Sequence, residues 1–546
     1  MSPLNSRILF QMAKADFLER VRGYRFLIVL GLAIAAAFFF VPSEDSGWVP
    51  VDLDGYRGVY DSAWIGAMVG LMSSLYLALF AFYAIKGSIS RDVETGVGQI
   101  IASTPVSKRL YIFGKWLSNF AVLLIMVLIV VIAAGVLQLV RGEDMKIEVW
   151  PLVAPSLIIA LPVMGLVVAI AVLFETIKPL RGGFGNIVYF FLFLFVIFLS
   201  GVAASFVLQN MERSLAESVS GYTGGSNCCM IIKSQSMDIL GRVWDGQETF
   251  RFSGMNWEPA IFLTRLIYLG AALGVVILAA RTFDRFDGMG TGPDRLAVFI
   301  DARKRNLLSL VPERLRRQDG PVEDSDVISG RSDDSFRLTT LARSTGFRFV
   351  GLLIAELRLT LKGLQWWYMV AVGLIVASLV MPLDSVQRGI LPALWIWPVL
   401  IWSNMGVREV QNHTDQLLFS TSNPLMRQFP ITWLSGVIVT ALLGSGVLVR
   451  LLVDGNTDGV IMLAVGALFI PSLALSLGIL SRSTKAFQIG YLSTWYLAVI
   501  QEVGRLDFMG RYPETAVADA VPVVFVGATL ILLVIAIVGR ARQVRN

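Results

Sequence analysis

Two segments of this chain are copies of one another: RDVETGVGQIIAST at residues 91–104 and REVQNHTDQLLFST at residues 408–421. The copies align without a gap, and Trp-Leu-Ser follows each at the same distance, at 116–118 and 433–435. Both copies are polar, and each lies between long apolar stretches. The match predicts an internal duplication in which each half presents this polar loop on the same side of a membrane.

The composition is that of a membrane protein. Hydrophobic residues make up 55% of the 546 residues and charged residues 16%, whereas soluble domains carry roughly 25% charged residues. The net charge of +6 fits a membrane protein with basic cytosolic loops. Because no basic run is interleaved with aromatic residues, we expect membrane lipid around the chain and no nucleic acid as a partner.

Twelve apolar stretches are predicted to cross the membrane as helices, which need about 20 residues for ~30 Å of hydrocarbon. Lys and Arg concentrate in alternate loops, so both termini are expected to be cytosolic in an inner or plasma membrane. The first stretch has the length of an anchor rather than of a cleaved signal. The predicted spans are 24–41, 62–85, 116–139, 152–174, 187–208, 259–280, 366–383, 389–405, 431–453, 459–480, 487–502 and 519–539.

The repeat extends beyond the polar loops. Ala-Asp-Phe at 15–17 leads to Arg-Gly just before the first span, and Ala-Glu-Leu at 355–357 leads to Lys-Gly just before the seventh. The prediction is therefore two six-span halves of the same topology, 1–280 and 351–546. Residues 281–350 alternate basic and acidic clusters among Gly and Pro, a composition typical of a flexible cytosolic linker.

Each polar loop is predicted to contain a short amphipathic helix. Its apolar face comprises Val93, Val97, Ile100 and Ile101 in the first copy, at the spacing of one helical face. A helix that lies on lipid carries a polar face rich in Lys and Arg. These loops carry acids and glutamines there instead, which favours a protein partner.

The run from Arg91 to Gly96, with Thr-Pro at 104–105 and Gly-Lys at 114–115, resembles the loop after the second span in ABC-2 type transporter permeases. In that family the loop forms a coupling helix that docks on the ATPase subunit, and residues 15–23 resemble the connecting helix before span one. The resemblance implies an all-α fold of twelve transmembrane helices in two pseudo-two-fold-related six-helix bundles, like type V exporters. It implies docking roles for Arg91, Asp92, Glu94, Gly96, Gln99, Arg408, Glu409, Gln411 and Gln416.

The second copy departs from the family pattern at two places. Gln411 stands in place of the second acid, and no Gly-Lys pair precedes Trp433. We therefore expect the second loop to dock more weakly than the first, or in a different way.

The chain has no nucleotide-binding loop of its own. No G-x-x-x-x-G-K-[ST] run occurs, and the glycines at 182–185 lack the lysine. ATP and Mg would be bound by a homodimer or pair of ABC ATPase subunits, two for each permease chain. With one histidine (His413), one cysteine pair (Cys228 and Cys229, oxidised or free) and no known catalytic motif, neither an enzyme nor a metal or cofactor site is predicted in this chain.

Aromatic residues crowd the fifth span of each half. In the resembled family, spans two and five line the central path, which implies that Phe190, Phe193, Tyr491 and Trp495 line a route for amphipathic or hydrophobic cargo. Alternatively, the rings face lipid or pack between helices. Arg265, near the outer end of a span, is expected to snorkel to the interface.

The sequence thus predicts the permease subunit of an ABC efflux transporter that works by alternating access. An ion- or proton-coupled secondary transporter without an ATPase partner is the alternative, although few ionisable residues fall inside the predicted spans. A membrane-embedded enzyme or assembly scaffold is a third alternative. The substrate stays open.

Overall fold

The computed structural model describes residues 3–43, 50–51, 53, 56–199, 201–219, 248–284, 286, 349–361, 365–412, 414–420, 424–500 and 503–545. Residues 1–283 and 349–546 form one compact unit, and 284–348 form a second, of which only residues 284 and 286 are described. The cysteine pair, His413 and most of the predicted linker lie outside the described residues.

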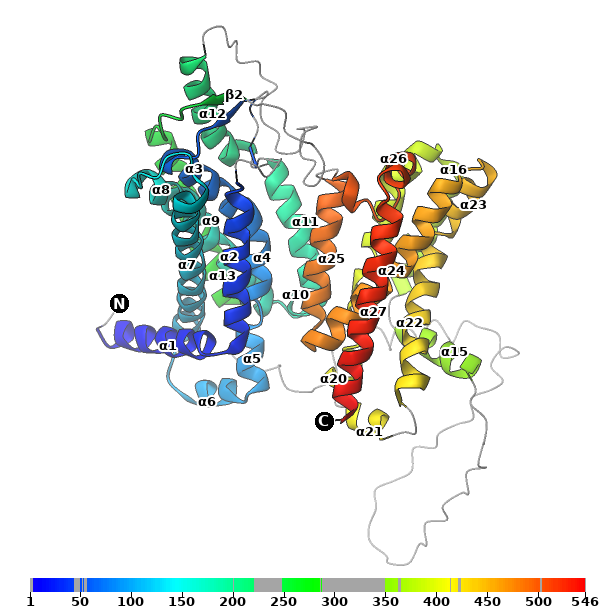
Figure 1. Cartoon of the computed structure of the whole chain (residues 1–546). Helices are drawn as coiled ribbons and strands as arrows, with labels where there is room; N and C mark the ends of the chain where they lie inside the picture. The colour runs from blue at the N-terminus through cyan, green and yellow to red at the C-terminus, as the bar shows by residue number, and fades with distance from the viewer. Residues whose placement is uncertain are drawn as a thin grey trace, which may run out of the picture. The chain divides into compact units, whose positions relative to one another are not determined.

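The first half is a series of helices that begins with α1 before the first predicted span (Figure 1). Its helices are α1 (Pro3–Val21), α2 (Tyr24–Phe40), α3 (Ser62–Met72), η2 (Ser73–Leu77), α4 (Ala78–Ile85), α5 (Ser88–Glu94), α6 (Val97–Ser103), α7 (Lys108–Arg141), α8 (Val149–Pro155), η3 (Ser156–Ala160), α9 (Leu161–Thr176), α10 (Lys178–Arg181), α11 (Gly183–Leu199), α12 (Gly201–Ser218) and α13 (Pro259–Thr282).

The second half is also helical, and its order follows that of the first. Its helices are α15 (Phe349–Thr360), α16 (Gln365–Val380), α17 (Leu383–Ser385), η5 (Val386–Ile390), α18 (Leu391–Ile396), α19 (Val399–Ser403), α20 (Arg408–Gln411), α21 (Asp415–Phe419), α22 (Pro424–Leu443), α23 (Ser445–Val453), α24 (Thr457–Ser481), α25 (Thr484–Val499), η6 (Gly504–Leu506), α26 (Pro513–Ala518) and α27 (Val521–Arg545).

Six helices in the described chain are long and apolar enough to cross a membrane, and a bent pair would make a seventh. This pair, α22 and α23, turns by 58°. The chain is therefore a helical, multi-pass membrane protein. Twelve spans stay a prediction, because some of the predicted stretches hold only short helices. One of these, 389–405, is divided into α18 and α19 at Pro398, which has no N–H to donate within a helix.

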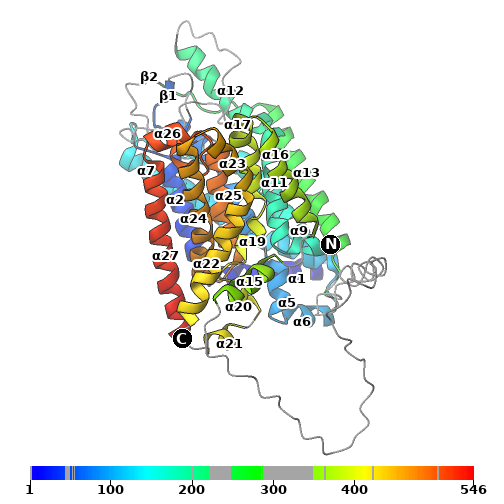
Figure 2. The same ribbon diagram turned by 90° about the vertical axis from the view of Figure 1, so that its right-hand side faces the viewer.

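The all-α prediction has one small exception in the described residues. Strand β1 (Tyr56–Gly58) pairs in parallel with β2 (Glu248–Phe250). In both views, the strands, α12 and α26 lie at one end of the long helices, and α5, α6, α20 and α21 lie at the other (Figures 1 and 2). The two copies of the polar loop therefore share one end of the bundle.

The two halves repeat one helix pair. Helices α9 and α13 pack along each other in the first half, as α24 and α27 do in the second (Figure 2). The C-terminal ends of each pair are joined: the hydroxyls of Thr176 and Thr282 lie 2.7 Å apart, and Gln543 Nε2 donates to Ile479 O at 2.9 Å. Both pairs are therefore parallel.

The duplicated tryptophans make corresponding hydrogen bonds. Trp116 Nε1 donates to Gly165 O of α9 at 3.0 Å, and Trp433 Nε1 donates to Ser472 Oγ of α24 at 2.9 Å. Each bond ties the helix that follows the polar loop to the next long helix. The sequence repeat thus has a counterpart in the packing of both halves.

Candidate functional site

The first polar loop folds as two short helices rather than one. Thr95 and Gly96 close α5 by donating back to the carbonyls of Arg91 and Val93, at 2.9 and 3.2 Å. Gly96 has φ +76°, a left-handed conformation that glycine adopts readily and that ends helices. The predicted single amphipathic helix is therefore wrong. The second loop breaks at the matching place, between α20 and α21.

Helix α5 is capped by a carboxylate from a distant helix. Glu175, at the end of α9, accepts from the backbone N–H groups of Gly87, Ser88, Ile89 and Ser90 at 2.7, 3.0, 2.6 and 3.1 Å. Its side chain is buried. A negative charge at the positive end of a helix satisfies the free N–H groups and stabilises the helix, so α5 is fixed on the end of α9.

Asp16 of α1 is a second anchor for the first loop. Its carboxylate accepts from Arg91 Nη2 at 2.9 Å, from Lys115 Nζ at 2.8 Å and from the Ser118 hydroxyl. Burial alone would raise the pKa of Asp16, but the charges of Lys115 and Arg20 and the hydrogen bonds lower it to about 2. The ionised carboxylate therefore joins α1, α5 and α7.

Asp92, predicted to dock on a partner, points into the protein. It is 5% exposed. Its carboxylate accepts from Tyr111 OH at 2.6 Å and from Lys115 Nζ at 2.9 Å. This side chain holds the loop on α7 and presents little surface to another chain.

The second loop uses the same positions. Arg408 pairs with Glu356 of α15, as Arg91 pairs with Asp16 of α1. Glu409, 3% exposed, stands where Asp92 stands in the first copy. Both predicted docking acids nearest the repeated arginines are thus buried in their own bundles.

A different cation serves the second loop. In the alignment of the two copies, Gln428 and Thr432 occupy the positions of Tyr111 and Lys115. Gln428 Nε2 still donates to Glu409 at 3.1 Å, but threonine carries no charge. Arg540 of α27 lies 3.3 Å from the Glu409 carboxylate instead. The balancing cation therefore comes from the last helix of the chain.

The predicted docking residues divide by exposure in the same way in both loops. The buried pair is Asp92 and Glu409; Arg91, Gly96 and Arg408 are half-buried; Glu94, Gln99, Gln411 and Gln416 are exposed. The four exposed residues are two pairs at matching positions. Beside them, Val97 and Ile100 are 41% and 67% exposed. A partner would meet this surface first.

A buried polar chain crosses between the halves beside the first loop. Lys86 Nζ donates to Asn186 Oδ1 at 2.7 Å, Asn186 Nδ2 donates to Gln488 Oε1, and Gln488 Nε2 donates to Ser403 Oγ at 3.3 Å. All four side chains are buried. We call these four residues the polar relay. Because the Lys86 carbonyl also accepts from the Lys485 ammonium, both halves hold Lys86, which lies two residues before α5.

The relay follows the repeat. Lys86 and Ser403 occupy equivalent positions when the alignment of the polar loops is extended toward the N-terminus. Asn186 and Gln488 share a second register with Tyr189 and Tyr491, which lie one helical turn further on. These tyrosines donate to Ala78 O at 2.9 Å and to Trp395 O at 2.8 Å. Equivalent residues Asn186 and Gln488 therefore meet each other, as side chains on a pseudo-two-fold axis do.

Two of the predicted path residues meet at the contact between the halves. Phe190, Phe193, Tyr491 and Trp495 are all buried. The rings of Phe190 and Trp495 meet edge to face across the halves, with centroids 5.9 Å apart. The structure thus places Phe190 and Trp495 in the contact between α11 and α25. Phe193 stacks on Tyr189 of its own helix, and Tyr491 meets Trp402 within the second half. A role of the four residues in cargo passage stays a prediction.

Arg265 does not snorkel as predicted. It is 4% exposed, and Nε, Nη1 and Nη2 have no hydrogen-bond partner in the part of the chain that the structure describes. The guanidinium lies 5.5 Å from the Tyr268 ring. Arg265 therefore lies on the face of α13 that packs against the protein. The sequence around it did not distinguish this face from the face toward lipid.

Among the described residues, no group of three or more His, Cys, Asp or Glu side chains could hold a metal ion. No protein-family model and no curated protein matches this chain.

Proposed function

We propose that this chain is the membrane subunit of an ATP-driven exporter of amphipathic or hydrophobic cargo. Its two polar loops are coupling elements for two separate ABC ATPase subunits, which bind ATP and Mg, and they lie on the cytosolic side of an inner or plasma membrane. The observation that carries the proposal is the pairing of the loops: each is held by buried ion pairs, and each exposes residues at matching positions.

The anchoring of the loops suits the transmission of force. Asp16 and Glu175 tie α5 to α1, α7 and α9, so a push on the exposed face of α5 moves several helices together. A solvated loop that only connects two spans needs no such ties. Buried, charge-assisted hydrogen bonds are strong enough to keep the loop rigid.

The route from loop to cargo path is short. Helix α5 begins two residues after Lys86, the first residue of the polar relay. A movement of α5 therefore acts at the contact between the halves, where the rings of Phe190 and Trp495 meet. Rocking of two bundles about such a contact alternates access from one side of the membrane to the other.

The docking surface is tested by changing its exposed residues. In E94K/Q411K, both substituted positions are exposed and neither side chain makes a hydrogen bond or ion pair among the described residues, so folding should be unchanged. We expect the ATPase co-expressed with the permease to be lost on purification, together with permease-stimulated ATP hydrolysis. E514K, an exposed acid on α26 at the opposite end, is the matched control.

If E94K/Q411K still co-purifies with the ATPase and still stimulates ATP hydrolysis, the two loops are not the docking surface. Transport that persists in vesicles without any ATPase would instead support the ion- or proton-coupled alternative.

A further inference from the structure

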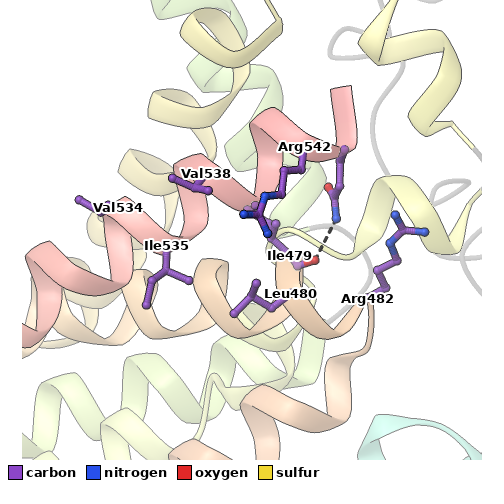
Figure 3. A pocket seen from close by; sticks show the side chains of 9 residues that line it. Ile479, Leu480, Arg482, Val534, Ile535, Val538 and Arg542 are labelled. Atoms are coloured by element: carbon purple, nitrogen blue, oxygen red, sulfur yellow. Dashed lines mark hydrogen bonds between the residues drawn. The ribbon is translucent and has the colours of Figure 1, made fainter. Parts of the chain in front are cut away.

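A groove of about 380 Å³ lies between the C-terminal ends of α24 and α27 (Figure 3). Leu480, Val534, Ile535 and Val538 form its apolar wall, and Arg482 and Arg542 contribute its charge. Val534 and Ile535 lie toward one end of the view and Arg482 toward the other, with Arg542 between them. The groove belongs to the second half, and its lining does not include the polar relay or the rings of Phe190 and Trp495.

The apolar wall is open to the surroundings. Leu480, Val534, Ile535 and Val538 are 58%, 60%, 37% and 46% exposed. Both helices are long and apolar enough to span a membrane. Aliphatic side chains exposed on such helices meet hydrocarbon chains, so the wall offers its surface to an acyl chain rather than to water.

The two arginines have no acidic partner among the residues that the structure describes. Arg482 and Arg542 are exposed, and neither guanidinium has an ion pair or a hydrogen bond with any residue that the structure describes. Arg540, two residues before Arg542, points elsewhere and lies 3.3 Å from Glu409. Of the arginines at the end of α27, Arg540 is thus neutralised by the protein and Arg542 is left to the groove.

Both arginines stand on ordered helix ends. Arg482 ends α24 in the left-handed conformation, with φ +53°, where glycine is the usual residue. The two helix ends are held together by the hydrogen bond from Gln543 to Ile479 O, drawn as a dashed line in Figure 3. The two guanidinium groups are therefore carried by a preformed surface rather than by a free tail.

The level of the arginines matches a lipid headgroup. Helix α27 has 25 residues, which at 1.5 Å per residue makes roughly 37 Å, more than the ~30 Å hydrocarbon core. Arg542 lies in its last turn and so falls in the interfacial region, where phosphate groups lie. A phosphodiester accepts charge-assisted hydrogen bonds from arginine.

We propose that this groove binds one anionic phospholipid, with its phosphate between Arg482 and Arg542 and an acyl chain along the wall of Leu480, Val534, Ile535 and Val538. A free phosphate ion would use the arginines but leave the wall uncovered. A zwitterionic lipid would cover the wall but gain less from two cations. The assignment does not depend on the transport function proposed above.

The test uses the full chain in a neutral detergent and native mass spectrometry. Phosphatidylglycerol is titrated as the probe, with phosphatidylcholine and inorganic phosphate as separate arms. We expect one tightly bound phosphatidylglycerol in the wild type and about 30-fold weaker binding in R482Q/R542Q, the effect of removing two cations near a charged headgroup. V538W places a bulky ring in the groove and keeps both arginines, so its binding of phosphatidylglycerol should also be weaker.

Matched controls keep the outcome decisive. R505Q/R545Q removes two exposed arginines that do not line the groove and should bind phosphatidylglycerol like the wild type. Equal losses in both double variants, equal binding of phosphatidylcholine, or competition by inorganic phosphate at comparable concentration would each overturn the proposal. Thermal unfolding of every variant checks that the fold is retained.

Discussion

The carboxylate of Asp16 connects α1, α5 and α7, and neighbouring cations and hydrogen bonds keep it ionised. Its pKa falls from 3.8 to about 2 because Lys115, Arg20 and Ser118 outweigh the effect of burial. The unfolded chain therefore takes up the proton first as the pH falls. The stabilisation, about 2 kcal/mol, is fully present above pH 4 and is lost as the pH approaches 2.

This pH dependence is measurable with D16N. The difference in unfolding midpoint between wild type and D16N should be constant from pH 7 to pH 5 and should shrink as the pH falls below 4. A difference that does not change with pH would mean that Asp16 contributes by packing and not by charge.

The buried pair of Glu409 and Arg540 should respond differently to single and double substitution. Removing one partner leaves an uncompensated buried charge, which costs about 3–5 kcal/mol. E409Q and R540Q should each lower the unfolding temperature, and E409L/R540M should recover most of the loss. The exposed pair of Lys146 and Glu148, 76% and 52% exposed, is the control, and its removal should change little. Additive losses in the double variant would contradict this coupling.

The buried guanidinium of Arg265 should lower the stability of the folded protein. Its guanidinium is buried without a hydrogen-bond partner among the described residues, and such a charge destabilises a protein by several kcal/mol. R265M should therefore raise the unfolding temperature in detergent. If transport falls at the same time, the charge serves the cargo or the cycle. A lower unfolding temperature would show that Arg265 has an anionic partner in the folded protein.

At the scale of the helix, the cap that Glu175 supplies should determine how stably α5 is folded. E175Q removes the charge but keeps the size, so the four N–H groups at 87–90 lose the charged carboxylate to which they donate. A loss of about 1–2 kcal/mol is expected, as for other caps. Hydrogen exchange at 87–94 should quicken while α7 stays protected. Unchanged exchange would place the restraint on Asp92 and Arg91 alone.

The sequence predicted the positions of the long helices better than the breaks within helices. Length and hydropathy located the long helices, such as α7 and α24. The division at Gly96 was missed because an apolar period of 3.6 continues across it, although glycine itself was a visible signal. The cap from Glu175 comes from a helix far from α5 in the sequence, and periodicity does not pair residues that belong to different helices.

At the scale of the whole molecule, the polar relay joins the two halves. Its central pair, Asn186 and Gln488, offers a place to cross-link them. In N186C/Q488C, with Cys228 and Cys229 replaced by Ser, a short bis-methanethiosulfonate reagent should cross-link the halves. If the halves must part here, transport should stop on cross-linking and return when a reductant cleaves the cross-link. N186C alone should be unaffected, and transport by the cross-linked chain would show that this contact stays closed.

The duplication could be found from sequence because gap-free matches fall in polar segments, where chance similarity is low. The relay could not, because Lys86, Asn186 and Gln488 sit in segments that match only in spacing, and this spacing changes between the polar loops and the later helices. The division of the predicted docking residues into buried and exposed ones also needed the structure: Asp92 and Glu94 are equally acidic, and only Glu94 is exposed.

The cation beside Glu409 has a consequence for biosynthesis. The first polar loop has all its partners, Asp16, Lys115 and Glu175, once the first third of the chain has been inserted. The second waits for Arg540, in the last helix of the chain. A ribosome that stops early would release a chain with one finished loop and one unfinished. Limited proteolysis of a chain stopped at residue 530 should cut at 408–420 and spare 88–103.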